Sequence, residues 1–377
     1  MTQRPAQHQR HISWRASAAR IATTRVTWAR KAPARSHYPM PVLMAFAALL
    51  LAPSVRAQGL FRDSTAVEVT FETDLKALIR DRDSTKFAPH AATLTYREGS
   101  GAPKTFPVTL RARGHFRRQA RNCDFPPLKL EFERKDARET LFQGNANLKI
   151  TTNCRASNDE YQQYILSEYA LYRAYQLVSP RYFRTRLARI TYHDTAKGMG
   201  DVVSWAFFIE DDKEVAKKFS TEVLTTRSAL FQDLDASQLA ITSLFEYMVA
   251  NTDWSISGLH NVALMRDSIG IYPVAYDFDW SGAVNTRYSF PDARLGIRTT
   301  TERLYRGPCR TIAEWQPIFD RFIAARPRIE AIYESLPALD LRRKRTVLDY
   351  FAAFYKIIGD PKAARRALID GCLPQGN

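Results

Sequence analysis

Residues 251–282 read NTDWSISGLHNVALMRDSIGIYPVAYDFDWSG, and most of the architecture expected for this chain follows from them. The residues just before them, 239–250, have apolar side chains at helical spacing. Residues 261–265 and 271–276 are short apolar runs without that period, which predicts a β-hairpin. The hairpin therefore separates a loop that contains Asp253 from a loop that contains Asp277 and Asp279.

The segments on the two sides of this stretch differ in their predicted secondary structure. Upstream, period-2 alternation and turn residues predict strands at residues 66–71, 92–96, 106–113, 128–132, 148–152, 186–193 and 202–209. Two upstream helices are expected, at residues 74–82 and 161–177, and the second begins after Asn158 and ends before Pro180. Downstream, apolar spacing predicts helices at residues 312–325, 329–336 and 341–358.

Residues 1–57 have the composition of a leader. They contain nine Lys and Arg and no Asp or Glu, and the apolar block 42–52 is followed by Val55-Arg56-Ala57. This pattern predicts a secretory signal peptide cleaved near Ala57 and a secreted or periplasmic protein. A start site assigned too far upstream or an organellar transit peptide would explain the basic bias equally well. Crossing a bilayer needs about 20 apolar residues, so no stable membrane anchor is expected.

The charge of the rest of the chain argues against a nucleic-acid partner. The whole chain has a formal net charge of +16, but without the leader 46 basic and 39 acidic residues remain, a net charge of +7. A dispersed excess of this size does not form the basic stripe typical of a DNA-binding surface.

All four cysteines lie after the leader. An even number in an oxidising compartment permits two disulfides, and no C-x-x-C spacing favours zinc or a redox motif. We expect Cys123 to pair with Cys154 on neighbouring strands, and Cys309 to pair with Cys372 and hold the C-terminal tail. The alternative is four buried free thiols.

The polar loops contain the residue types that phosphoryl transfer needs. This reaction uses a carboxylate that orients and deprotonates the acceptor hydroxyl, and oxygen ligands for the magnesium that bridges the nucleotide phosphates. Asp253, then Asn261 eight residues later, then Asp277 after the next strand, follow the order of a kinase catalytic loop and its metal-binding segment. Each residue alone is also a common cap or turn residue, so the order carries the prediction.

The chain resembles the spore-coat-protein-H (CotH) type of atypical protein kinase over roughly residues 105–285. The shared features are Asp253, His260-Asn261, the segment 276–279 with Gly282, Arg113-Gly114-His115 and the strand 128–132. The resemblance implies an α+β, two-lobed atypical protein-kinase-like fold with a sheet-rich N-terminal lobe and a mainly helical C-terminal lobe. Its implied units are a leader (1–57), a sheet-rich lobe with one helix (58–210) and a helical lobe with the catalytic and metal-binding loops (211–377).

The resemblance also implies the role of each site residue. Asp253 would be the catalytic base, and Asn261 and Asp277 would bind Mg²⁺ or Mn²⁺ against the phosphates of ATP, with Asp279 as the fallback ligand. This chain departs from the family pattern in two ways. The loop from Asp253 to Asn261 is longer than in some members, and residues 123–127 replace the basic run that usually precedes the first-lobe strand.

Phosphoryl transfer from ATP also needs a lysine near the α- and β-phosphates, usually held by a carboxylate of a helix. Lys129 and Lys149 both lie in strand-like runs, and Glu168 is the only carboxylate in the body of the following helix. No Gly-rich phosphate loop occurs, so Arg113 and its neighbours would have to take that place.

Three functional classes remain after this reasoning. The favoured one is a secreted kinase that transfers phosphate from ATP to a hydroxyl, expected to be a Ser or Thr of a protein substrate. The second is a catalytically inactive, kinase-like binding or assembly protein of the envelope. A hydrolase that uses Asp277 and Asp279 is weaker, because alternate residues of an extended segment point to opposite faces.

Overall fold

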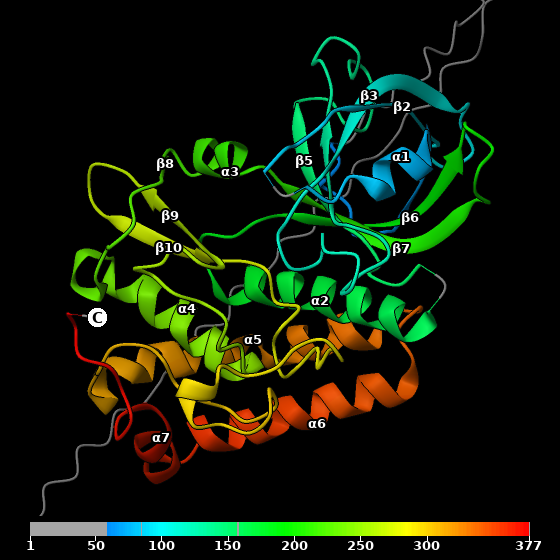
Figure 1. Cartoon of the computed structure of the whole chain (residues 1–377). Coiled ribbons are helices and arrows are strands. Elements are labelled where there is room, and N and C mark those ends of the chain that lie inside the picture. Colours follow the sequence, from blue (N-terminus) through cyan, green and yellow to red (C-terminus); the bar gives the residue numbers. More distant parts are fainter. Residues whose placement is uncertain (1–58, 84, 157, 377) are drawn as a thin grey trace, which may run out of the picture. The chain divides into compact units, whose positions relative to one another are not determined.

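The computed structural model describes residues 59–83, 85–156 and 158–376, so the predicted leader and cleavage site lie outside the described residues. Seven strands close into a barrel in the order β1-β2-β3-β4-β5-β7-β6 (Figure 1). Their bounds are β1 (Val67–Thr73), β2 (His90–Tyr96), β3 (Lys104–Ala112), β4 (Leu128–Glu131), β5 (Asn147–Thr151), β6 (Thr185–Asp194) and β7 (Val202–Glu210).

The barrel closes where β1 pairs with β6. These two strands are parallel, with Val67 opposite Ala188, whereas all other neighbours in the barrel are antiparallel. Residues on alternate positions point inward, so Leu110, Leu130 and Leu148 are completely buried. Closure leaves the barrel without an unpaired edge strand.

The predicted fold class is wrong. The resemblance predicts a kinase-like fold with a sheet-rich lobe and a helical lobe, but the strands form a closed mixed barrel. The physical reason is the pairing of β1 with β6, because period-2 alternation predicts a strand and its buried face but not its partner strand. The outer face of β7 also shares one hydrophobic core with the helices, through Phe207 and Ile209.

One helix, α2, lies against β6 and β7, and α5 packs on α2. The longest upstream helix, α2, packs against β7 on one side and α5 on the other (Figure 1). It begins after Asn158, whose side chain accepts a hydrogen bond from the backbone N–H of Glu160 at 2.9 Å. The helices are α1 (Leu75–Arg80), α2 (Asp159–Val178), α3 (Asp212–Lys218), α4 (Ala236–Val249), α5 (Ile312–Glu334), α6 (Leu341–Ile358) and α7 (Pro361–Leu368).

The predicted hairpin between the polar loops is confirmed. It consists of β9 (Val262–Arg266) and β10 (Ile271–Ala275), and a third strand, β8 (Glu222–Leu224), pairs with β9. The hairpin packs against α4, so the loops before β9 and after β10 lie at one end of this helix. The sequence patterns do not predict β8, because three residues are too few for a measurable period.

Both predicted disulfides are present, Cys123–Cys154 and Cys309–Cys372, and no free cysteine remains among the described residues. The first one joins the residues just before β4 to those just after β5 rather than the strands themselves. Paired cysteines are typical of proteins in oxidising compartments. Among residues 59–376, gaps excepted, no helix is long and apolar enough to cross a membrane.

Candidate active site

Asp253 is held by hydrogen bonds to both of its carboxylate oxygens. His260 Nε2 lies 3.0 Å from Oδ1, and Asn261 Nδ2 donates to Oδ2 at 3.0 Å and to the backbone oxygen of Asp253 at 2.7 Å. The loop between these residues is closed by an isolated bridge in which Ser255 and His260 exchange two backbone hydrogen bonds of 3.0 Å. The predicted base is therefore fixed in place while its side chain stays 35% exposed.

His260 is a neighbour of the predicted base rather than an isolated loop residue. The hydrogen bond to Asp253 raises the pKa of His260 above its ordinary value, against the opposing effect of partial burial. The contact with Asp253 therefore favours the protonated form of the His260 imidazole.

Asn261, just before β9, and Asp277, just after β10, lie at the same end of the hairpin. The backbone N–H of Tyr276 donates to the carbonyl oxygen of Asn261 at 3.1 Å, and the backbone N–H of Asp277 donates to the Tyr172 hydroxyl at 2.8 Å. Both residues have positive φ angles, +54° for Asn261 and +65° for Asp277. Left-handed backbone is costly outside glycine and is concentrated at functional sites, and Asn and Asp tolerate it best.

The oxygen atoms of these two side chains have no protein partner among the described residues. The Asp277 carboxylate forms no hydrogen bond or ion pair, and Asn261 uses its amide nitrogen while its Oδ1 accepts nothing. Oxygen ligands of this kind fit Mg²⁺, which is typically held by one or two carboxylates together with substrate phosphates. Across the described ranges, no group of three or more His, Cys, Asp or Glu forms a closed metal cage.

Asp279 has a different environment from Asp277. It is 5% exposed, accepts a hydrogen bond from the Tyr288 hydroxyl at 2.9 Å, and lies 3.9 Å from a guanidinium nitrogen of Arg117. Burial raises the pKa of Asp279 to about 7, with a further contribution from the charge of Asp277. Its carboxylate is therefore already engaged, which makes it a less suitable metal ligand than Asp277.

Glu168 lies in the same buried group of charges. It is 1% exposed on α2, and neither of its carboxylate oxygens has a hydrogen-bond partner among the described residues. Burial raises its pKa well above the ordinary value, and the charges of Asp279 and Asp277 add to the shift. Neither candidate lysine contacts it, so the predicted lysine–Glu168 ion pair is wrong: Lys149 binds Asp212 at 2.7 Å and Lys129 binds Glu131 at 2.7 Å.

The two candidate lysines lie opposite each other on β4 and β5 but have different surroundings. Lys149 lines a small hollow of about 10 Å³ together with Arg113 and Asp277, and its ammonium group lies 5.2 Å from the centre of the Tyr276 ring. Lys129 is 37% exposed and does not line this hollow. The structure therefore brings Lys149 and Arg113, but not Lys129, next to Asp277.

Arg113 lies at the end of β3, where the chain turns. Its backbone N–H donates to Pro127 at 2.8 Å, its Nε donates to the Leu128 carbonyl at 3.2 Å, and Gly114 follows with φ +81°. This left-handed backbone is the conformation that favours glycine. The Arg-Gly pair of the sequence thus aims Arg113 toward the hollow.

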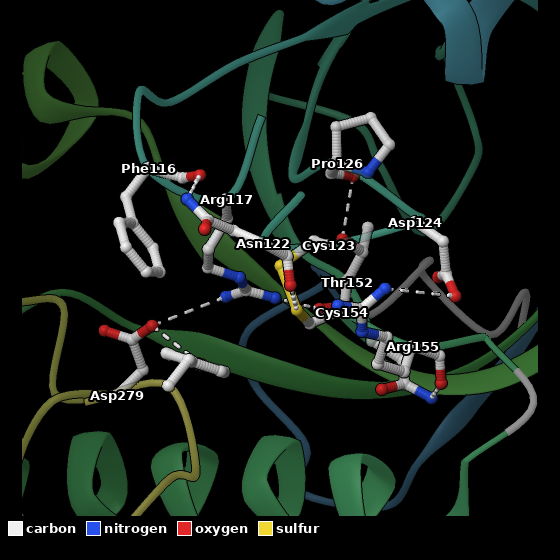
Figure 2. Close-up of a disulfide and its surroundings, with 12 residues drawn as sticks. Phe116, Arg117, Asn122, Cys123, Asp124, Pro126, Thr152, Cys154, Arg155 and Asp279 are labelled. Carbon is white, nitrogen blue, oxygen red and sulfur yellow. Dashed lines mark hydrogen bonds and ion pairs between the residues drawn. A yellow bond between two sulfur atoms is a disulfide. The ribbon is translucent and has the colours of Figure 1, made fainter. Parts of the chain in front are cut away.

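The sequence patterns do not single out Arg117, which the structure places in the site. Figure 2 shows it reaching from the loop stapled by Cys123–Cys154 toward Asp279 and the backbone oxygen of Thr152. Its guanidinium is buried among the charges of Asp279 and Glu168. No sequence period or motif distinguishes Arg117, because it is one of several arginines in residues 111–121. A run of arginines does not show which one folds inward.

No protein-family model matches this chain, and no curated protein is similar to it at a significant level. The assignment of the site therefore depends on its residues and geometry.

Proposed function

We propose that this protein is a secreted, ATP- and metal-dependent phosphotransferase that phosphorylates a hydroxyl group, with a Ser or Thr of a protein as the acceptor. The observation that carries the proposal is the convergence of Asp253, Asn261 and Asp277 at one end of α4, next to a hollow that contains Lys149 and Arg113. The order of these residues resembles the CotH type of kinase, but the proposal concerns the chemistry and does not depend on a kinase-like fold.

In this reaction Asp253 orients the acceptor hydroxyl and takes its proton. The hydroxyl oxygen forms a bond to the γ-phosphorus, the bond between that phosphorus and the bridging oxygen of ADP breaks, and ADP leaves with the electron pair. His260 and Asn261 hold the carboxylate in one orientation, so no rearrangement of Asp253 is needed when the proton moves.

The side chains present fit a magnesium or manganese ion. Asp277 and Asn261 would hold it with the oxygen atoms that have no protein partner, and the ion would neutralise negative charge on the phosphates. The cationic groups of Lys149 and Arg113 lie beside Asp277 and are suited to the remaining phosphate oxygens.

The proposed location outside the cytoplasm has support from two features. Both disulfides fit an oxidising compartment, and the composition of the N-terminal residues is typical of a secreted precursor.

The test is a thermal-unfolding titration of the purified protein with ATP and either Mg²⁺ or Mn²⁺, beside Asp277→Ala. A ligand that binds only the folded protein stabilises it by about 2.7 kcal/mol at a concentration a hundred times its Kd, so a rise of several degrees in Tm is expected. The Asp277→Ala variant should lose this rise. The matched control is Asp349→Ala on α6, an exposed aspartate without contacts from its carboxylate to described residues, which should keep it.

A metal-dependent rise in Tm that Asp277→Ala removes, together with transfer of ³²P from ATP to an acceptor protein, supports the proposal. Stabilisation without phosphoryl transfer would favour the inactive, nucleotide-binding alternative. An unchanged Tm with every nucleotide and metal would contradict the proposed site.

A further inference from the structure

A second cavity is lined by Asp253, which does not line the hollow with Lys149. It has a volume of about 650 Å³, and its wall includes Asp253, His260, Trp280, Phe290 and Arg306. A hydroxyl group that reaches Asp253 from this cavity would approach the base without passing the proposed phosphate-binding side chains. We therefore take this cavity to be the groove for the acceptor.

A neighbouring cavity of about 470 Å³ adjoins the groove. The two cavities share Trp254, Ser255 and Arg306 as wall residues, and the second one reaches Leu373 near the C-terminal end. Two adjoining cavities of this size exceed the needs of a small hydroxyl compound and suit an extended segment of polypeptide.

One wall of the groove is aromatic. The rings of Trp280 and Phe290 have their centres 4.9 Å apart, and Phe116 packs edge-on against Trp280 at 5.2 Å. Phe290 is 60% exposed, which is unusual for a side chain of this size. An aromatic pair with one exposed ring beside a groove is suited to an apolar side chain of a bound peptide.

Arg306 is the cation of the groove that lacks an ionic partner. Its Nη1 donates to the carbonyl oxygens of Thr252 and, at 3.0 Å, of Trp254, and it forms no ion pair with any described residue. The two carboxylates whose charges act on Arg306 have other partners, because His260 holds Asp253, and Arg294 holds Asp292 through side-chain and backbone hydrogen bonds.

The two carbonyl bonds leave the other N–H groups of Arg306 without a partner among the described residues. Burial lowers the pKa of Arg306, which is the expected effect of removing a guanidinium from water without a full counter-charge. An anion in the groove would supply that charge, and a guanidinium binds a carboxylate through two parallel hydrogen bonds.

We propose that the acceptor is an acidic peptide segment, in which Arg306 binds a carboxylate near the phosphorylated Ser or Thr and Trp280 and Phe290 bind an apolar neighbour. This inference rests on the proposed function, since it assigns Asp253 as the base that meets the hydroxyl. Arg306 is then a residue that determines specificity.

The test uses three fluorescein-labelled peptides with the same central Ser and the same Leu, and with Glu, Gln or Lys on both sides of the Ser. Binding is measured by fluorescence anisotropy, and phosphoryl transfer from ATP is measured separately. The wild-type protein should bind the Glu peptide at least about tenfold more tightly than the Gln peptide and should bind the Lys peptide least. In Arg306→Gln the ratio between the Glu and Gln peptides should fall toward one.

The control variant is Arg298→Gln, which removes an arginine whose side chain is 91% exposed in the same loop and should keep the preference. If Arg306 has only a structural role, Arg306→Gln should weaken the binding of the Glu and Gln peptides by the same factor. The ratio of their Kd values would then stay unchanged, which would overturn the inference. Equal binding of the two peptides by the wild-type protein, or no binding of either, would overturn it as well. Phosphoryl transfer without tighter binding of the Glu peptide would contradict only the acidic-peptide inference. Tighter binding of the Glu peptide without nucleotide binding or phosphoryl transfer would contradict the proposed function and leave the peptide site supported.

Discussion

Asp253 receives hydrogen bonds at both carboxylate oxygens, and this arrangement allows its role to be separated from metal binding. An amide at this position keeps the shape of the side chain but cannot take a proton. We expect Asp253→Asn to lower kcat by about 10²- to 10⁴-fold, the range that a positioned general base contributes. The stabilisation by ATP and Mg²⁺ should persist, because Asp253 is not a proposed metal ligand.

Steady-state transfer of ³²P and the thermal titration measure these two effects on the same preparation. Asp349→Asn serves as the matched control and should resemble the wild-type protein in both. Turnover that stays at the wild-type level in Asp253→Asn would remove Asp253 from the reaction.

Glu246 on α4 is a second buried acid close to the site. It is 1% exposed, and both of its carboxylate oxygens lack a hydrogen-bond partner among the described residues. Burial raises the pKa of Glu246 well above its ordinary value of 4.5, and the charge of Asp253 adds to the shift. The folded protein therefore keeps this proton at pH values where the unfolded chain releases it.

The sign of the resulting pH dependence follows from proton linkage. Above pH 4.5 the unfolded chain binds fewer protons than the folded one, so the free energy of unfolding falls by up to about 1.4 kcal/mol per pH unit until the folded carboxyl also ionises. We expect Glu246→Gln to remove this slope, so that its stability relative to the wild-type protein rises from pH 5 to pH 8. Urea unfolding at several pH values measures it, with the exposed Glu334→Gln as control, and parallel curves for wild type and Glu246→Gln would contradict the assignment.

At the scale of elements, the Cys123–Cys154 disulfide organises the loop that reaches the site. It joins the two ends of the segment that contains β4 and β5, and Arg82 donates further hydrogen bonds to the carbonyl oxygens of Arg118, Cys123 and Asp124. Arg117 lies six residues before Cys123, in the loop between β3 and β4 that the disulfide ties to the residues after β5, and it contacts Asp279 (Figure 2). The covalent link therefore holds a charged group of the candidate site in position.

The stabilisation from this link is testable. The two cysteines are 31 residues apart, for which the loss of chain entropy in the unfolded state corresponds to about 3 to 4 kcal/mol. Cys123→Ser/Cys154→Ser should lose roughly this amount in urea unfolding and should bind ATP with Mg²⁺ more weakly. Cys309→Ser/Cys372→Ser, which opens a loop of 63 residues far from Arg117 in sequence, provides the comparison. A loss below about 1 kcal/mol in the first variant would show that the loop is held by its hydrogen bonds alone.

Two helices position the loops of the site. Helix α2 provides the Tyr172 hydroxyl that holds the backbone of Asp277, and the end of α4 leads directly into the loop of Asp253. Helices α2 and α4 both belong to the main hydrophobic core. The loops that contain Asp253 and Asp277 are therefore attached to rigid supports. This attachment explains how two residues with left-handed backbone keep their conformations.

At the scale of the whole molecule, the closed barrel makes a prediction about hydrogen exchange. In an open sheet, β1 would be an edge strand, and the N–H groups facing away from β2 would exchange rapidly. In the barrel these groups pair with β6 along residues 67–73, so we expect β1 to be as protected as the interior strands β2 and β3.

Hydrogen–deuterium exchange with mass spectrometry on peptides from β1, β2 and β3 measures this difference. Fast exchange restricted to β1 would argue against closure. The variant Phe71→Ala offers a check at the seam, since Phe71 is completely buried and stacks on Tyr192 of β6 at 5.8 Å between ring centres. Its loss should cost about 3 to 5 kcal/mol of stability, as for other buried aromatic residues.

The sequence by itself determined the local features of this protein. Alternation located the strands, apolar spacing and the Asn158 cap located α2, and the apolar runs after Asn261 and before Tyr276 predicted the hairpin, because each of these signals depends only on residues close together in the chain. The number and placement of the cysteines favoured the two disulfides, with four free thiols as the alternative that the structure removed among the described residues. The order Asp253, Asn261 and Asp277 also predicted residues that the structure brings together.

Only the tertiary structure decided how the strands pair and which charged residues face one another. The closure of β1 on β6 overturned the predicted two-lobed fold, and Lys149 was found with Asp212 instead of Glu168. The inward position of Arg117 and the unpaired charge of Arg306 were equally invisible in the sequence. The physical reason is the same in each case: these contacts join residues far apart in the chain, and the periodic patterns of single segments determine which face is buried but not what that face meets.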